Sequence, residues 1–163
     1  MLKKMVLLYD LRFFMSFLDV IKWEVFEKGK SECRKKFIYN INKQITDKTL
    51  EMELLNEIPW EDTKIEEEYG FVVAHAKEAY VFSSVVKPQL GEIAFFQADD
   101  TVLDEVKNAI SYRKENILNT WKNTIPGLEK RINASWEGKI GQYYCFVLGT
   151  DTEKVVNYLR SLK

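Results

Sequence analysis

The strongest constraint on the fold is the stretch Gly91–Trp121, which combines a short apolar segment, a polar turn and a long amphipathic segment. Residues 92–98 (EIAFFQA) form an apolar run of strand length, and Asp99, Asp100 and Thr101 offer helix-capping side chains. The apolar positions of the following segment recur at helical spacing: Leu103, Val106, Ile110, Ile117 and Trp121. This pattern predicts a buried strand and a helix over 101–122 that covers the sheet.

One charged residue interrupts the apolar stripe of this helix. Arg113 lies between Ile110 and Ile117, where a guanidinium is costly to bury unless it is paired. Glu92, at the start of the preceding strand, is the nearest candidate partner in the predicted layout. A satisfied ion pair or a snorkelling arginine is the more frequent arrangement. The alternative is an arginine that faces a cleft, where it would suit a carboxylate or a phosphate.

The rest of the chain supplies the other elements of a domain. A strand over 80–86 is separated from 92–98 by a short connector that contains Pro88, which predicts an antiparallel hairpin. The apolar run 142–148 predicts a central strand, and a capping box precedes a final helix over 151–162. The predicted class is α+β, with a mainly antiparallel sheet packed by helices and an additional N-terminal helix.

The N-terminal third is predicted to contain further short elements. Residues 5–28 carry apolar side chains at helical spacing, which predicts a helix that packs on the core or docks on a partner. Residues 37–45 alternate like a short strand, and residues 48–57 suit a helix that Pro59 ends. We expect two parts, with an N-terminal helix and connector over 1–46 and an α+β domain over 47–163.

Composition narrows the classes of function. The 163 residues include 24 basic and 25 acidic side chains, so the formal net charge is −1. A nucleic-acid-binding domain usually shows a basic excess, and this balance disfavours that class. Apolar runs near the N-terminus are interrupted by charges at Asp10 and Arg12, so neither a signal peptide nor a membrane span is predicted.

Catalytic and metal-binding patterns are missing from the sequence. His75 is the single histidine, and a nucleophile would need it as a base. The two cysteines, Cys33 and Cys145, lack zinc-ligand spacing, and Cys145 suits a buried apolar position. The acidic run 66–68 and the pair at 99–100 are better explained by solvated charge and by helix capping. We therefore expect neither an enzyme nor a cofactor nor a bound metal.

The segments GEIAFF, DEVKNAISYRKENILNTW and GKIGQYYCFVLGTDTEKVVNYL together resemble an uncharacterised bacterial family, domain of unknown function four-three-five-eight, over about residues 50–163. The family pattern has an acidic residue that opens an apolar strand, a helix with an arginine, then an aromatic, a proline and a glycine-led strand. The matching positions here are Glu92, Arg113, Trp121, Pro126, Gly141 and Tyr143. Glu92, Arg113 and Tyr143 are the candidate ligand-binding residues.

The resemblance implies no assigned activity. Members of that family are often small lipoproteins of the cell envelope, whereas the sequence as written, without a lipid-attachment cysteine, predicts a cytoplasmic protein. The leading prediction is a non-catalytic binding or scaffolding module that acts through protein–protein contact, with an unidentified partner or with a second copy through the N-terminal helix. The alternative is a protein, or an enzyme, that binds a small anionic ligand in a cleft near Arg113.

Overall fold

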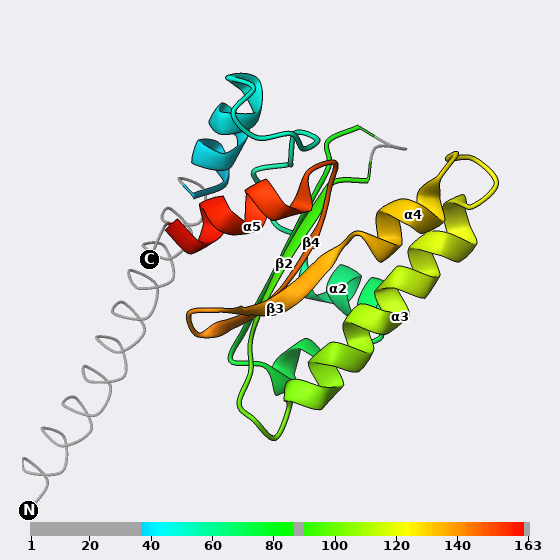
Figure 1. The fold of residues 1–163 in the computed structure, drawn as a ribbon. Coiled ribbons are helices and arrows are strands. Elements are labelled where there is room, and N and C mark those ends of the chain that lie inside the picture. Colours follow the sequence, from blue (N-terminus) through cyan, green and yellow to red (C-terminus); the bar gives the residue numbers. More distant parts are fainter. Residues whose placement is uncertain (1–36, 87–89, 162–163) are drawn as a thin grey trace, which may run out of the picture. The chain divides into compact units, whose positions relative to one another are not determined.

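A four-stranded antiparallel sheet forms the centre of the molecule, with helices on both faces (Figure 1). The computed structural model describes residues 37–86 and 90–161, which from Ile38 onward form one unit. The strands lie in the order β1 (Glu78–Ser83), β2 (Glu92–Gln97), β4 (Tyr143–Leu148) and β3 (Trp136–Ile140), each antiparallel to its neighbour. The predicted α+β class with a mainly antiparallel sheet is confirmed.

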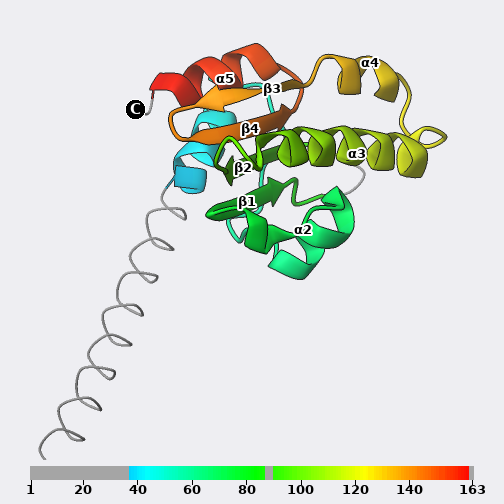
Figure 2. The same ribbon diagram turned by 90° about the horizontal axis from the view of Figure 1, so that it is seen from below.

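The helices divide between the two faces of the sheet. After a helix over residues 37–46, they are in chain order α2 (Asp62–Tyr69), the 3-10 turn η1 (Val73–His75), α3 (Leu103–Trp121), α4 (Leu128–Asn133) and α5 (Thr152–Ser161). The view from below shows α3 and α2 on one side of the strands and α5 on the other (Figure 2). Helix α3 contacts both α2 and α4, whereas α5 packs on β3 and β4. The long helix α3 therefore organises one face.

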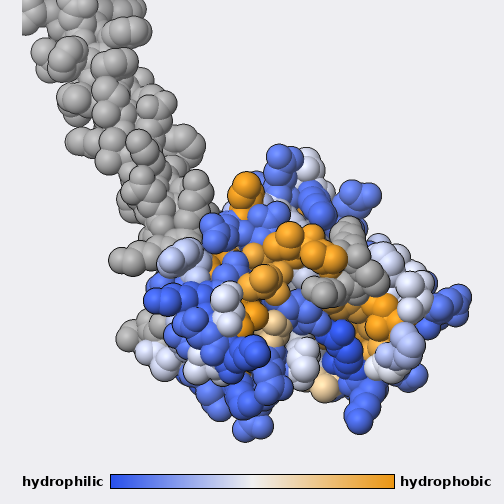
Figure 3. Space-filling view, turned by 90° about the horizontal axis from the view of Figure 1, so that it is seen from above, coloured by the Kyte–Doolittle hydropathy of each residue, from blue (hydrophilic) through white to orange (hydrophobic). Residues whose placement is uncertain are grey.

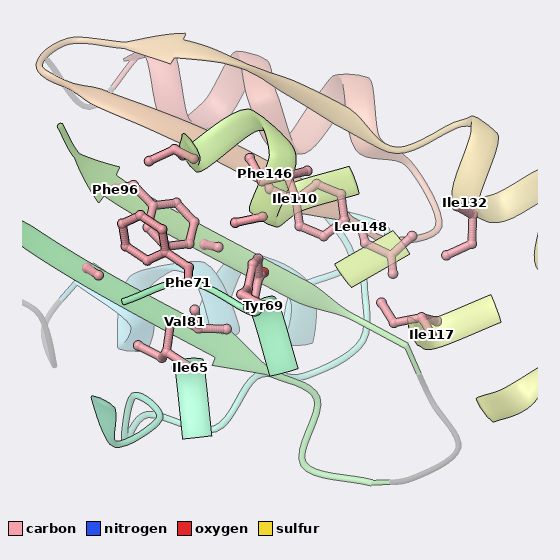
Figure 4. Packing of buried hydrophobic residues seen from close by; sticks show 14 of the residues in the cluster. Ile65, Tyr69, Phe71, Val81, Phe96, Ile110, Ile117, Ile132, Phe146 and Leu148 are labelled. Atoms are coloured by element: carbon pink, nitrogen blue, oxygen red, sulfur yellow. The ribbon is translucent and has the colours of Figure 1, made fainter. Parts of the chain in front are cut away.

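The main core lies between the sheet and α3. On α3 the buried residues recur with helical spacing: Val106, Ala109, Ile110, Arg113 and Ile117. Opposite them, the Phe96 ring of β2 makes edge contacts with Tyr69 at 5.4 Å and with Phe71 at 5.5 Å between ring centroids (Figure 4). Edge-to-face geometry of this kind is the preferred aromatic packing. The predicted stripe of α3 is thus the surface that closes the core.

Two predicted elements near the start of the described chain are wrong. Residues 37–46 form a helix rather than a strand, because the buried Ile38 and Ile41 lie three positions apart. Residues 47–61 contain no helix before α2. Their backbone pairs instead with the end of β1, where Leu55 and Ser84 form a bridge and the Asn56 N–H donates to the Ser83 carbonyl at 2.9 Å. These tertiary hydrogen bonds outweigh the local helix preference.

Two elements were not predicted. Helix α2 buries Ile65 and Tyr69, four positions apart, and ends at Gly70 in the left-handed conformation (φ 58°). Strand β3 contains Gly138 at its centre, which obscures its strand character. A Cβ at that glycine would lie 2.7 Å from the Trp136 ring, so the missing side chain leaves room for the indole.

The predicted caps of α3 are also wrong. No side chain hydrogen bonds to the first turn of this helix, whose N-cap residue is Val102. The Asp99 carboxylate pairs with Lys77 at 2.8 Å instead, and Asp100 lies 3.9 Å from Lys139. Both carboxylates therefore pair with surface lysines, Lys77 before β1 and Lys139 on β3, rather than with the helix terminus.

The predicted N-terminal helix over 5–28 lies outside the described residues. In the part of the chain that the structure describes, no helix combines the length and the apolarity needed to cross a bilayer. The predicted boundary between the two parts, at residue 46, stays a prediction.

Replacing Phe96 with alanine should lower the free energy of unfolding by about 3–5 kcal/mol, because the buried ring fills the space between β2 and α2. The matched control is Val72→Ala at a position 47% exposed, for which we expect a loss below about 0.5 kcal/mol. Urea unfolding followed by circular dichroism measures both. Equal losses in the two variants would contradict this assignment of the core.

Candidate functional site

Arg113 is drawn into the interior by its place on α3. It lies one helical turn after Ile110 and one before Ile117, both of which are buried against the sheet. The same face therefore carries the arginine inward, and its side chain is 11% exposed. A charged group at this depth is stable when counter-charges meet it with good geometry.

Glu92 supplies the main counter-charge. It opens β2 on the side of the sheet that faces α3 and is 3% exposed. The Arg113 guanidinium donates from Nε to Oε1 of Glu92 at 3.0 Å and from a terminal nitrogen to Oε2 at 2.7 Å. A two-pronged contact of this kind matches the planar guanidinium to the planar carboxylate and is among the stronger polar interactions in proteins. The predicted pair between strand and helix is present.

Helix α2 adds two further members to the cluster. The Tyr69 hydroxyl donates to Oε1 of Glu92 at 2.6 Å, and the other terminal nitrogen of Arg113 donates to Oε2 of Glu68 at 2.5 Å. Asn116 of α3 also donates to that Glu68 oxygen, at 3.1 Å. We call Glu68, Tyr69, Glu92 and Arg113 the buried charge cluster. It joins α2, β2 and α3 at one point.

The buried charge cluster fixes the protonation states of Arg113 and Tyr69. Burial alone would lower the pKa of Arg113, but the charge of Glu92 and its hydrogen bonds raise it above the ordinary value. Burial, followed by the negative charge of Glu92, raises the pKa of Tyr69 well above 10. Arg113 is therefore charged and Tyr69 neutral at physiological pH, which suits their roles as hydrogen-bond donors to Glu92.

A cavity of about 270 Å³ opens beside the buried charge cluster. Glu68, Glu92 and Arg113 line one part of it. Trp60 and Trp121 contribute aromatic walls, and Trp60 is held in place by a hydrogen bond from its indole nitrogen to the Ser83 hydroxyl at 2.8 Å. The Arg113 guanidinium carbon lies 5.1 Å from the centre of the Trp60 ring, which is within the range of a cation–π contact.

Tyr143, the third predicted ligand-binding residue, does not join the other two. It lies on the opposite face of the sheet, and its hydroxyl donates to Glu78 at 2.7 Å. Burial, with the Glu78 hydrogen bond second, raises the pKa of Tyr143 to about 12. Glu78 begins β1 and Ser83, which lines the cavity, ends it, so the two sites are separated by about 17 Å of extended strand.

Three residues of the site were missed by the sequence analysis. Glu68 was assigned to solvated charge, yet its carboxylate meets Arg113, and Tyr69 and Trp60 were given no role. The spacing of Ile65 and Tyr69 before Gly70 is typical of a short amphipathic helix and could have placed Glu68 and Tyr69 at its end. The position of Trp60 depends on the pairing of residues 54–60 with β1, for which the sequence offers no signal.

Other chemically active side chains lie elsewhere. His75 is half exposed and its Nδ1 contacts the Glu105 carboxylate at 2.8 Å, outside the residues that line the cavity. Cys145 is buried as predicted, and burial raises the pKa of its thiol to about 12, which leaves it protonated. Among residues 37–86 and 90–161, no three histidine, cysteine or acidic side chains are arranged to hold a metal ion.

Comparison with known proteins assigns the chain to a family. The family model described as a domain of unknown function (DUF4358) matches residues 50–149, and the chain belongs to this family. The matched region includes all four members of the buried charge cluster and the residues that line the cavity. Searches of curated proteins and of solved structures returned no significant match.

Replacing Glu92 with glutamine should cost about 3–5 kcal/mol of unfolding free energy, because it removes the main counter-charge of a buried guanidinium while keeping the side-chain shape. The matched control is Glu137→Gln, which breaks the partly exposed pair with Lys114 and should cost less than about 1 kcal/mol. Chemical denaturation at pH 7 measures both. Similar small losses would show that the Glu92–Arg113 pair carries little of the stability.

Loss of the phenolic proton of Tyr69 should also lower the stability of the protein at alkaline pH. The pKa of Tyr69 is raised in the folded state, so above pH 10 the unfolded chain loses the phenolic proton first and the free energy of unfolding decreases as pH rises. In Tyr69→Phe this part of the slope is absent, although the lost hydrogen bond to Glu92 costs about 1–2 kcal/mol at pH 7. Urea unfolding at a series of pH values from 8 upward gives both quantities. An unchanged slope in the variant would contradict the assignment.

Proposed function

We propose that this member of the DUF4358 family is a non-catalytic binding or scaffolding module that acts through contact with another protein. The observation that carries the proposal is a set of exposed aliphatic side chains just after β1 and on the segment 54–58, whose backbone hydrogen bonds to the end of β1. We call them the apolar patch: Leu54, Ile58, Val85 and Val86, which are 48%, 68%, 62% and 55% exposed. Apolar surface gathers near the middle of the face in Figure 3. Grouped exposed aliphatics mark contact surfaces more often than isolated ones do.

The apolar patch has a defined backbone. The Val85 N–H donates to the Leu54 carbonyl at 3.0 Å, which holds these two residues side by side, and Ile58 follows on the same segment. The segment also covers the outer edge of β1, because Asn56 and Trp60 donate backbone hydrogen bonds to Ser83 and Val81. A partner at this end would therefore bind through side chains and not by adding a strand to β1.

The geometry gives less support to the second candidate, a small anionic ligand bound by Arg113. That guanidinium already donates three hydrogen bonds to carboxylates, so its charge is offset before a ligand arrives. A catalytic role has no stronger support, because the single histidine contacts Glu105 away from the cavity. Both remain predictions, as do self-association through the N-terminal segment and the location in cytoplasm or cell envelope.

The proposal is tested by capture of partners from native cells with the full chain as bait. Val85→Asp places a charge in the apolar patch and should reduce recovery of a partner by about tenfold or more, as loss of a central contact does. The matched control is Val72→Asp, the same change at an exposed valine that precedes β1 and lies outside the patch. It should leave recovery unchanged.

Two outcomes would count against the proposal. The first is that both variants retain the same proteins as the unmodified chain, and the second is that both lose them equally. Near-ultraviolet circular dichroism of the two variants establishes that each keeps its fold, because the tryptophan and tyrosine signals report packing around Trp60 and Tyr69.

A further inference from the structure

We propose that the cavity beside Arg113 is a binding site for an organic cation, that is, for an alkylammonium or guanidinium group. The inference concerns the cavity and not the apolar patch, so it does not depend on the proposed function. It follows from the charge of the cavity wall, from the aromatic rings in that wall and from the size of the space.

The wall carries an excess of negative charge. Glu67, Glu68 and Glu92 line the cavity together with one cation, Arg113, which gives the lining a formal charge of −2, and the Lys64 ammonium beside Trp60 reduces the local net charge to −1. Glu92 already accepts three hydrogen bonds, two from Arg113 and one from Tyr69. The excess negative charge would repel an anion, whereas it would attract a cation, which would offset it.

Glu68 offers an acceptor to such a cation. Arg113 and Asn116 both donate to its Oε2 atom, so among the described residues Oε1 of Glu68 makes no hydrogen bond. A carboxylate has room for about four donors. Its side chain is 30% exposed and lines the cavity, so a donor in the cavity can approach it.

The aromatic walls suit the same ligand chemistry. Two of the protein's own cations already lie against Trp60, with the Lys64 ammonium 4.4 Å and the Arg113 guanidinium carbon 5.1 Å from the ring centre. Trp121 adds a second indole to the cavity wall. An ammonium near an indole face is attracted by the negative charge of the ring face, and the effect grows where water is excluded.

The size of the cavity restricts the ligand to a short group. Its volume of about 270 Å³ lies just below the range of about 300–1,000 Å³ that is typical of drug-sized ligands. Leu90, Ile117 and Leu148 provide apolar contacts for a short alkyl chain. Two sources offer this chemistry, namely a free primary amine and the lysine side chain of a partner protein.

The test is a titration of the full, isotopically labelled chain with n-butylammonium chloride, followed by the indole N–H resonances of Trp60 and Trp121. Sodium butyrate at the same ionic strength is the matched ligand of opposite charge. We expect saturable shifts of both resonances with butylammonium, at a dissociation constant of about 1–10 mM for so small a ligand, and much smaller shifts with butyrate. The affinity should fall as salt is added.

A pair of variants tests whether a carboxylate in the cavity wall attracts the ligand. Glu67→Gln removes an exposed carboxylate that lines the cavity and should weaken butylammonium binding about three- to fivefold. Glu66→Gln removes the same charge next to it, from a residue that does not line the cavity, and should change the affinity less than about 1.5-fold. Glutamine at 66 keeps an oxygen that can accept the Val73 N–H.

A blocked pentapeptide with a central lysine, and the same peptide with acetyl-lysine, separate the two sources. Binding of butylammonium alone supports a free amine, and tighter binding of the lysine peptide than of its acetylated form supports a side chain from a partner. The proposal is overturned if butyrate shifts the two indoles as strongly as butylammonium does. It is equally overturned if neither butylammonium nor the lysine peptide gives a saturable shift up to about 100 mM, or if E66Q and E67Q weaken binding alike.

Discussion

The contact between Arg113 and Glu92 is the interaction on which the arrangement of this domain depends. It joins the middle of α3 to the start of β2, and through Tyr69 and Glu68 it also holds the end of α2. A buried ion pair offers little net stability over apolar packing, because both charges lose their water. The pair contributes specificity instead. A two-pronged hydrogen bond allows one register of helix against strand, whereas apolar side chains tolerate several. Loss of Arg113 would leave the Glu92 carboxylate without a counter-charge at the edge of the aromatic core, and loss of Glu92 would leave Arg113 paired only with the partly exposed Glu68.

The same contact decides what the adjoining cavity can recognise. An arginine on an apolar helix face can mark a site for anions, which the sequence offers as the alternative to an ion pair with Glu92. In the folded chain two carboxylates meet the guanidinium, so the charge at the cavity wall is set by Glu67 and Glu68 rather than by Arg113. Whether an arginine marks an anion site therefore depends on the count of carboxylates around it, and that count belongs to the tertiary structure.

Local patterns predicted the elements with the strongest apolar signals. Helices α3 and α5 show helical periodicity, the β1–β2 hairpin and β4 show apolar runs of strand length, and the Glu92–Arg113 pair followed from the stripe of α3. Residues 47–61 could not be predicted in the same way, because their hydrogen bonds go to the edge of β1, far along the chain. Trp60 and the apolar patch depend on that pairing. The sequence therefore predicted the side of the cavity that α3 and β2 provide, but not the side that depends on Trp60.

The apolar patch and the cavity share the end of β1, which links the two proposals physically. Ser83 and Ser84 line the cavity, and the next residue, Val85, belongs to the apolar patch. A protein seated on the patch would lie beside the cavity and could place a basic side chain in it. A free amine in the cavity would then compete with that side chain, whereas an amine that the partner covers would be held more tightly. Since coupling between two sites is reciprocal, the effect of the amine on partner affinity would equal the effect of the partner on amine affinity and would carry the same sign.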